Sequence, residues 1–323
     1  MSTIAVDAMG GDSAPEEVVK GAILAKKEGV DVILSGDENL IKSYLGNEKI
    51  PVINYPQVIS MDDDPAKAIR SNKDSSIIGA LNLVKEKKAD AVFSAGSTGA
   101  TLIGAISVLG KIKGVTRPTI ASVLPGKEKE VILVDSGANL EVKPKVLYQF
   151  AIMGSKLSEL LFDIENPRIG LINNGEESSK GRELEKATFK LLKSSQLNFI
   201  GNVEGKDFAN SKVDVFVTDG FTGNVVLKTL QGVAKLQQDL ISKSLKENLF
   251  KPLLIPVKKA ISPVKSMLNP NSTNGSYLLG VNGLVIIGHG SSNSEAIKNA
   301  LLFTSRAVEK RFINKFTEVS SEL

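Results

Sequence analysis

The sequence VDVFVTDGFTGNVVLKTLQG, residues 213–232, joins an apolar run to a segment of helical spacing through a turn with two glycines. The run before the turn predicts a buried strand, and the pattern after it predicts a helix. Gly220 and Gly223 let the backbone turn sharply, and Thr222 or Asn224 is a candidate helix cap. The same turn can instead hold an anion, because free N–H groups at a helix start favour negative charge. For this turn taken alone, both interpretations stay open.

Strand-like runs of this kind recur along the chain, and segments of helical length separate most of them. Continuous apolar strands that alternate with helices indicate the α/β class, with a mostly parallel sheet covered by helices on both faces. The predicted strands are 3–8, 31–36, 90–95, 130–136, 168–173, 213–218 and 283–288, and the predicted helices include 16–29, 75–88, 144–161 and 178–193.

Polar turns rich in Gly, Asp, Asn, Ser or Thr directly follow six of the predicted strands. The carboxyl ends of parallel strands share one edge of a sheet, where ligands bind, so we expect one composite site there. This expectation favours the anion-binding interpretation of the opening turn. The six turns are DAMGGD (7–12), SAGSTGA (94–100), DSGAN (135–139), NNGEES (173–178), DGFTGN (219–224) and GHGSSN (288–293).

The composition excludes several kinds of site. The chain has no cysteine, which excludes disulfides, thiolate zinc sites and a cysteine nucleophile, and its one histidine, His289, excludes a histidine-rich metal centre. Neither a P-loop nor a nucleophile-elbow motif is present. The 40 basic and 36 acidic residues give a net charge of +4, too small to indicate nucleic-acid binding. We therefore expect no metal, no cofactor and no nucleic-acid partner.

What remains is a site of backbone amides, hydroxyls, side-chain amides and lysines. Such groups stabilise phosphate and oxyanions without metal or redox chemistry, which favours acyl or phosphoryl transfer. The chain of 323 residues shows no secretory leader and no run of about 18 apolar residues, so we expect a cytoplasmic protein.

The segment 233–268 is predicted to form a basic amphipathic helical hairpin with an apolar tip around LFKPLLIPV. It holds seven lysines against one aspartate and one glutamate, and Pro252 and Pro256 end the first helix. The tip can pack in the core or on a partner subunit, contact anionic lipid, or receive an acidic protein. The residues predicted for the membrane or carrier-protein contact are Leu253, Leu254, Ile255, Lys258, Lys259 and Lys265.

Several motifs in order along nearly the whole chain closely resemble the bacterial phosphate acyltransferase family. They are VDAMGGD, AGSTGA, RPTIA (117–121), DSGAN, YQFAIMGS (148–155), GEESSKG (175–181), FIGNVEGKD (199–207), VTDGFTGNVVLKTLQG and HGSSN. The sequence departs from that family's usual pattern at Ser13, where histidine is common, at Ser97, where asparagine is frequent, and in NGEES, where GTED is typical.

The resemblance implies a fold similar to phosphotransacetylases and isocitrate-type dehydrogenases, one domain over residues 1–323, a homodimer and a reversible peripheral membrane contact through the hairpin. It implies transfer of a fatty acyl group from acyl-acyl-carrier protein to inorganic phosphate, with acyl phosphate as the product for phospholipid synthesis. It also favours Lys180 and Asn224 as catalytic residues. The expected contacts to substrate or phosphate are Gly96, Ser97, Thr98, Asn139, Gly220, Gly223 and His289.

Three alternatives accompany this expectation. A phosphotransacetylase acting on acyl-coenzyme A would share the chemistry. A decarboxylating dehydrogenase of similar fold would need a carboxylate metal set and a nucleotide site, neither of which the sequence shows. A non-enzymatic, membrane-associated scaffold would explain the hairpin but not the six polar turns. In the leading hypothesis, the Asn224 amide or the backbone N–H groups of 220–224 stabilise the oxyanion, and Lys180 holds the phosphate.

Overall fold

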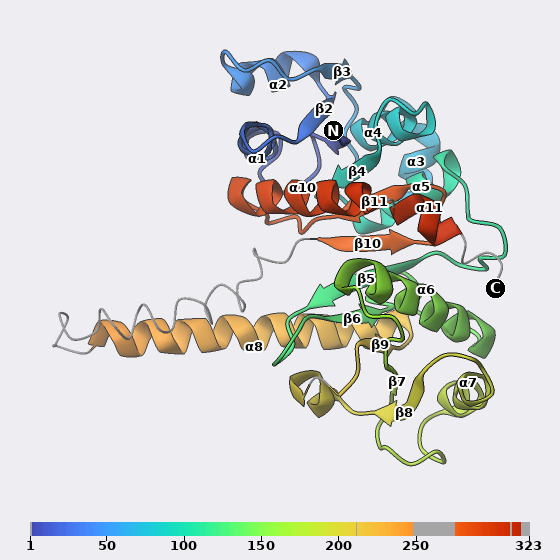
Figure 1. Ribbon diagram of the computed structural model, residues 1–323. Coiled ribbons are helices and arrows are strands. Elements are labelled where there is room, and N and C mark those ends of the chain that lie inside the picture. Colours follow the sequence, from blue (N-terminus) through green and yellow to red (C-terminus); the bar gives the residue numbers. More distant parts are fainter. Residues whose placement is uncertain (1, 211, 248–274, 311, 318–323) are drawn as a thin grey trace.

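The strands form where the sequence places its continuous apolar runs, and they join into one eleven-stranded sheet in the computed structural model (Figure 1). The structure describes residues 2–210, 212–247, 275–310 and 312–317. The sheet order is β3-β2-β1-β4-β11-β10-β5-β6-β9-β7-β8. The strands are β1 (Thr3–Asp7), β2 (Asp31–Gly36), β3 (Val52–Asn54), β4 (Ala91–Ser94), β5 (Thr119–Leu124), β6 (Val131–Val134), β7 (Ile169–Ile172), β8 (Phe199–Val203), β9 (Val215–Val217), β10 (Ser276–Leu279) and β11 (Leu284–Ile287).

Helices cover both faces of the sheet, as predicted. Successive side chains of a strand point to opposite faces, and in β1 Ile4 and Val6 belong to one buried cluster while Ala5 belongs to another. The first cluster includes side chains of α1, α6 and α10, and the second includes those of α4 and α5. The helices are α1 (Glu16–Lys27), α2 (Glu38–Leu45), α3 (Pro65–Ser71), α4 (Ser76–Lys85), α5 (Thr98–Val108), α6 (Pro144–Phe162), α7 (Glu183–Lys193), the 3₁₀ turn η1 (Gly205–Asn210), α8 (Gly220–Glu247), α10 (Ser294–Glu309) and α11 (Phe312–Thr317).

All seven predicted strands are confirmed, and three of the four predicted helices match within a few residues. The fourth, predicted over 178–193, begins only at Glu183. Gly181 has a positive φ of 93° and Arg182 is extended, so the backbone cannot be helical there. The Glu185 side chain accepts a hydrogen bond from the Arg182 N–H and so fixes the helix start.

The sheet is mostly parallel, but its two halves run in opposite directions. Strands β3, β2, β1, β4 and β11 pair in parallel, and so do β6, β9, β7 and β8. Between the two sets, β10 is antiparallel to β11 and to β5, and β5 is antiparallel to β6. Three reversals leave the carboxyl ends of the two sets at opposite edges.

The expectation that the six polar turns share one edge is therefore wrong. The turns 7–12, 94–100 and 288–293 follow strands of one set, and the other three follow strands of the second set. The error arose because β5 and β10, the strands that reverse the direction, were not predicted. The two sets of turns meet instead across the junction of β10 and β5, where a pocket is found.

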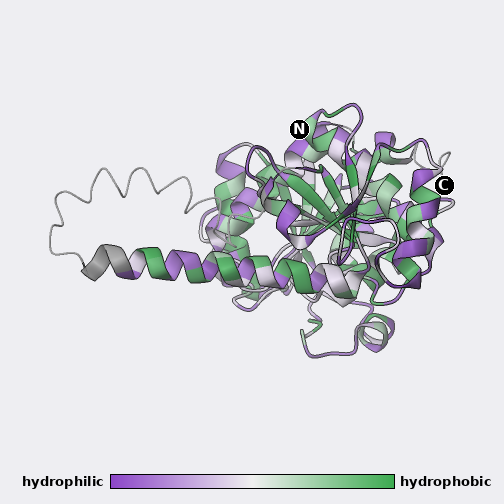
Figure 2. Ribbon diagram, turned by 90° about the horizontal axis from the view of Figure 1, so that it is seen from below, coloured by the Kyte–Doolittle hydropathy of each residue, from purple (hydrophilic) through white to green (hydrophobic). Residues whose placement is uncertain are grey.

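Helix α8 is continuous over Gly220–Glu247, about 42 Å at 1.5 Å per residue, and its far end projects past the body of the protein (Figure 2). Only the first arm of the predicted hairpin lies in the part that the structure describes; the expected contact residues Leu253, Leu254, Ile255, Lys258, Lys259 and Lys265 lie outside it. In the described ranges, none of the helices has the length and apolar character needed to cross a membrane. Exposed apolar side chains of α8 are Phe221, Val225, Leu230, Val233, Leu236 and Leu240.

Candidate active site

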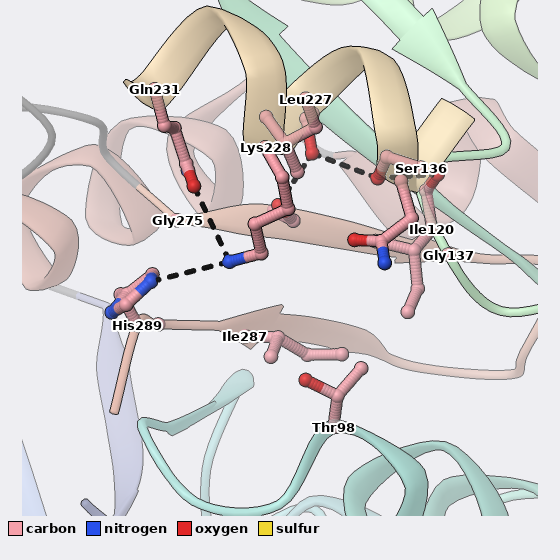
Figure 3. Close-up of a pocket in the computed structure, with 14 residues that line it drawn as sticks. Thr98, Ile120, Ser136, Gly137, Leu227, Lys228, Gln231, Gly275, Ile287 and His289 are labelled. Atoms are coloured by element: carbon pink, nitrogen blue, oxygen red, sulfur yellow. Dashed lines mark hydrogen bonds between the residues drawn. The ribbon is translucent and has the colours of Figure 1, made fainter. Parts of the chain in front are cut away.

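A pocket of about 320 Å³ lies where the two halves of the sheet meet, beneath the first turns of α8 (Figure 3). Thr98 and His289 enter it from turns of the first set. Ser136 and Asn224 enter it from turns of the second set. The pocket therefore unites turns from opposite edges, which the strand directions alone would keep apart.

Three of the predicted site residues line this pocket together: Thr98, Asn224 and His289. Gly96 and Ser97 line a second, very small cavity of about 10 Å³. The Ser97 hydroxyl accepts a 3.4 Å hydrogen bond from the Ala100 N–H and caps α5. Gly96 and Ser97 thus shape the turn that carries Thr98 and do not face the larger pocket.

Asn139 is part of the scaffold under the pocket. Its side-chain amide donates to the Pro118 carbonyl and to Asp135, both at 2.9 Å, so both amide hydrogens have partners. The Asp135 carboxylate also accepts the N–H groups of Gly137, Ala138 and Asn139. Burial raises the pKa of Asp135, and these N–H donors oppose that shift. The expected contact of Asn139 with phosphate is therefore corrected to a structural role.

The glycines of the opening turn serve close packing rather than anion binding. The N–H of Gly220 donates to the Asn139 carbonyl at 2.8 Å, and the N–H of Gly223 donates to the Asp219 carbonyl at 2.9 Å. The Asp219 side chain accepts the Thr222 N–H at 2.8 Å, so Asp219 caps the helix in place of Thr222 or Asn224. The N–H groups of Gly220, Thr222 and Gly223 are therefore occupied within the protein, whereas the Asn224 side chain lines the pocket.

The two turns approach so closely that only glycine fits between them. A Cβ at Gly220 would lie 2.7 Å from the backbone of Asn139, and one at Gly223 would lie 1.8 Å from the Asp135 carbonyl oxygen. Asn224, directly after this contact, meets Gly137 of the facing turn. The position of Asn224 is thus set by glycine packing one residue earlier.

Arg182 ties the loop that carries Lys180 to the opening turn. Its Nη2 lies 2.5 Å from Asp219 and 2.5 Å from Glu185, two carboxylates that are 3% and 8% exposed. These partners raise the pKa of Arg182, which stays charged. Arg182 was not predicted as a site residue; its signal in the sequence is an arginine three residues before a glutamate at a helix start.

Replacing Arg182 with methionine is expected to lower the free energy of unfolding by about 2–3 kcal/mol at pH 7, because two buried carboxylates lose their cation. A fully buried pair would cost more, but 61% of the Arg182 side chain is exposed. Urea unfolding at pH 7 checks this, with Lys186→Met as the control for an exposed charge on the same helix. A deficit no larger in Arg182→Met than in Lys186→Met would contradict the explanation.

Lys180 does not line the pocket under α8 that holds Asn224 and His289, the main pocket of the candidate site. It is exposed in a separate surface hollow shared with the acidic residues Glu176, Glu177 and Glu204 and with Lys206. The loop that holds it follows β7, which pairs in parallel with β9, so it lies at the same sheet edge as the opening turn. The structure therefore brings Asn224 and His289 together but keeps Lys180 outside their pocket.

A lysine that the sequence analysis did not assign lies inside the pocket. Lys228 Nζ is 3.5 Å from His289 Nε2 and 3.3 Å from Gln231 Oε1 (Figure 3). Its signal was its position on α8 one turn after Asn224. Burial and Lys228 lower the pKa of His289, and Asp12 opposes them, so the imidazole is neutral near pH 7.

Serines from three neighbouring strands and turns also line the pocket. Ser122 Oγ donates to Ser136 Oγ at 2.8 Å, and Ser136 Oγ donates to the Ile120 carbonyl at 3.1 Å. Ser122 and Ser276 are 2.8 Å apart, and since the Ser122 proton is already used, Ser276 donates to Ser122. The three hydroxyl protons point along the chain of serines, so the serines offer lone pairs to the pocket.

Asp7 lies buried beneath the turns of the first set. It is 3% exposed, and Ser94 Oγ donates to its Oδ2 at 2.6 Å. Burial raises the pKa of Asp7, and the hydrogen bonds oppose that shift. A Cβ at Gly10 would meet both Asp7 and the Gly96 N–H, so the carboxyl supports two glycine turns that pack against each other.

The family model described as "Fatty acid synthesis protein" matches residues 2–315. Among curated relatives, a "Phosphate acyltransferase" of Halothermothrix orenii is 43% identical over 320 residues, covering 96% of each chain. A protein of the same description from Desulfitobacterium hafniense is 45% identical over 327 residues, covering 99% of this chain and 97% of its own.

Two solved structures show similarity of fold. The EutD phosphotransacetylase of Staphylococcus aureus superposes with a TM-score of 0.62 at 18% identity, covering 94% of this chain and 93% of its own. A 4-hydroxythreonine-4-phosphate dehydrogenase of Klebsiella pneumoniae gives a TM-score of 0.55 at 13% identity, covering 94% and 98%. At these identities the similarity shows the fold alone, and the chemistry depends on the residues of the site.

Proposed function

We propose that this chain moves a long-chain acyl group from acyl-acyl-carrier protein to inorganic phosphate, with acyl phosphate as the product. The proposal starts from the fact that the chain belongs to the fatty acid synthesis protein family and is an acyltransferase. The phosphate acyltransferase relatives support phosphate as the acceptor, and the family description supports a fatty acyl donor. Those names state neither the acyl-carrier-protein donor nor the acyl phosphate product, and both are part of this proposal.

The observation that carries the proposal is the pocket itself. The Asn224 amide, the Lys228 ammonium and apolar side chains such as Leu227 and Ile287 converge on one cavity. Among the described residues that line it, none is acidic. An anion and the apolar end of a thioester therefore fit the same space without repulsion from a carboxylate.

In the proposed mechanism, a phosphate oxygen attacks the thioester carbonyl carbon. The carbonyl becomes an oxyanion, which the Asn224 side-chain amide stabilises. Collapse of that intermediate breaks the C–S bond and releases the thiol as thiolate, which needs little acid assistance because thiol pKa values lie near about 8.5. Phosphate is the nucleophile, so the chain needs no covalent intermediate.

We also propose a homodimer in the cytoplasm with reversible contact to the membrane surface. The exposed apolar side chains of α8, Val233, Leu236 and Leu240 among them, support a partner or lipid contact on this helix. Sedimentation of the full chain, alone and with anionic vesicles, tests both statements.

The test of the reaction is release of free carrier-protein thiol from palmitoyl-acyl-carrier protein, with and without inorganic phosphate. Phosphate-dependent release supports the proposal. Faster release from palmitoyl-coenzyme A would favour the phosphotransacetylase alternative, to which the shared fold lends support. Release that ignores phosphate would indicate hydrolysis, and no release from either thioester would favour a scaffold.

Lys180 remains a proposed catalytic residue. Replacing it with alanine is expected to lower kcat/KM roughly 10-fold or more, the loss typical of a hydrogen bond to a charged group. Lys206→Ala, which removes the same charge from the same surface hollow, is the control and should change the rate little. Full turnover in Lys180→Ala would confine the chemistry to the main pocket.

A further inference from the structure

The charge of the main pocket comes from one side chain. Among the described residues that line it, Lys228 is the only one with a formal charge at neutral pH. Gln231 Oε1 accepts a 3.3 Å hydrogen bond from Lys228 Nζ, and this contact directs the ammonium toward His289. An ammonium has three donors and no acceptor, so this one contact leaves donor capacity facing the cavity.

We assign the proton of the neutral His289 ring from the backbone hydrogen bond that its Nδ1 atom accepts. The backbone N–H of Ser291 donates to Nδ1 at 3.3 Å, and Ser291 Oγ lies 2.8 Å from the same atom. Nδ1 is thereby an acceptor, so in the neutral ring the proton is on Nε2. The Nε2–H of His289 and the Lys228 ammonium, 3.5 Å apart, are then two donors that cannot satisfy each other.

Two converging donors require an acceptor between them, and among the described residues no serine of the pocket hydrogen-bonds to either donor. Ser276 in β10 donates its hydroxyl proton to Ser122 in β5, and Ser122 donates to Ser136 in the turn after β6. Ser136 in turn donates to the Ile120 carbonyl. The serine side of the pocket presents lone pairs, which repel an anion. The Lys228 and His289 side presents positive charge and N–H groups, which attract one.

We propose that Lys228 and His289 form the binding site for the acceptor phosphate, holding its oxygens between Nζ and Nε2 while Asn224 faces the thioester carbonyl. The inference rests on the proposed function for the identity of the anion. It assigns Lys228 a role in binding the ground state, distinct from oxyanion stabilisation.

The experiment measures the KM for phosphate and the binding of inorganic phosphate to the full-length protein without acyl donor, by phosphorus-31 NMR line broadening. Lys228→Met and His289→Leu should each weaken phosphate about 10- to 100-fold, with a smaller change in kcat at saturating phosphate. Lys228→Arg and His289→Gln keep an N–H donor and should retain most of the affinity.

Lys235→Met is the matched control, since it removes the same charge from the same helix about 10 Å further along. It should leave phosphate affinity unchanged. An unchanged KM in Lys228→Met, or an equal rise in Lys235→Met, would overturn the proposal. If the wild type binds phosphate through Lys228 but transfers no acyl group to it, the anion site stands and the proposed function fails.

Discussion

Replacing Gly223 with alanine is expected to reduce acyl transfer by more than about 100-fold, because the turn that places Asn224 can no longer pack against its neighbour. The new methyl carbon would lie 1.8 Å from the Asp135 carbonyl oxygen, a backbone atom that no rotamer change can move. The Asp135 side chain is held by four donors of its own turn, including the amide of Asn139, so that turn resists displacement. The opening turn must therefore shift, and Asn224 with it. Overpacking of this kind also costs about 1–3 kcal/mol of stability or more.

A matched control lies on the same helix. A Cβ at Gly232 meets nothing within 4 Å, so Gly232→Ala should leave activity unchanged and raise the free energy of unfolding by about 0.5–1 kcal/mol. Thiol release should therefore fall only in Gly223→Ala. Urea unfolding should show a lower free energy of unfolding for Gly223→Ala and a higher one for Gly232→Ala. Gly223→Ala with normal turnover would show that the contact between the turns does not position Asn224.

The Asn224→Ala variant is expected to lose about 10²–10³ in kcat, the usual cost of removing one oxyanion donor. Asn224 is exposed at the pocket, so the protein should fold normally and the KM for phosphate should change little. Single-turnover release of carrier-protein thiol at saturating phosphate measures the step directly.

Gln231→Ala is the control for this variant, because it removes a second amide that lines the same pocket. It is expected to change kcat far less, since its carbonyl oxygen contacts Lys228 and is not an oxyanion donor. A kcat for Asn224→Ala close to that of the wild type would assign the oxyanion to another group.

Much of the fold could be predicted because local patterns determine strands and helices. The runs before the six polar turns, and helices such as 144–161, were placed from apolar spacing alone. The direction of the strands was not predictable in this way. It depends on β5, whose sequence TIASVL contains small and hydroxyl residues, and on β10, whose sequence is SYLL, and neither strand was predicted. The direction in which neighbouring strands pair is set by tertiary packing, so the apolar pattern of one strand does not reveal it.

The site was predicted in part for a similar reason. Thr98, Asn224 and His289 lie in polar turns after predicted strands and were singled out with the help of the family resemblance, and all three line one pocket. Asn139, Gly220 and Gly223 have the same local appearance, but their donors are used by neighbouring backbone. Lys228 resembles any lysine on an exposed helix face. Its position one turn after Asn224 is a weak signal, and its proximity to His289, 61 residues away in sequence, is what distinguishes it.

Helix α8 carries Asn224 near the end that packs against the body of the protein, and its other end projects into solvent (Figure 2). Asn224 therefore lies much closer to the packed end than the tip of the helix does. At 1.5 Å per residue, Asn224 is about 6 Å along the axis from Gly220, and Glu247 is about 40 Å from Gly220. Rotation about the glycine pivot thus moves the tip about seven times as far as it moves Asn224. A rigid tilt of α8 that moves its tip by several ångströms would thus shift Asn224 by about one ångström, so a contact made at the tip would disturb the pocket little.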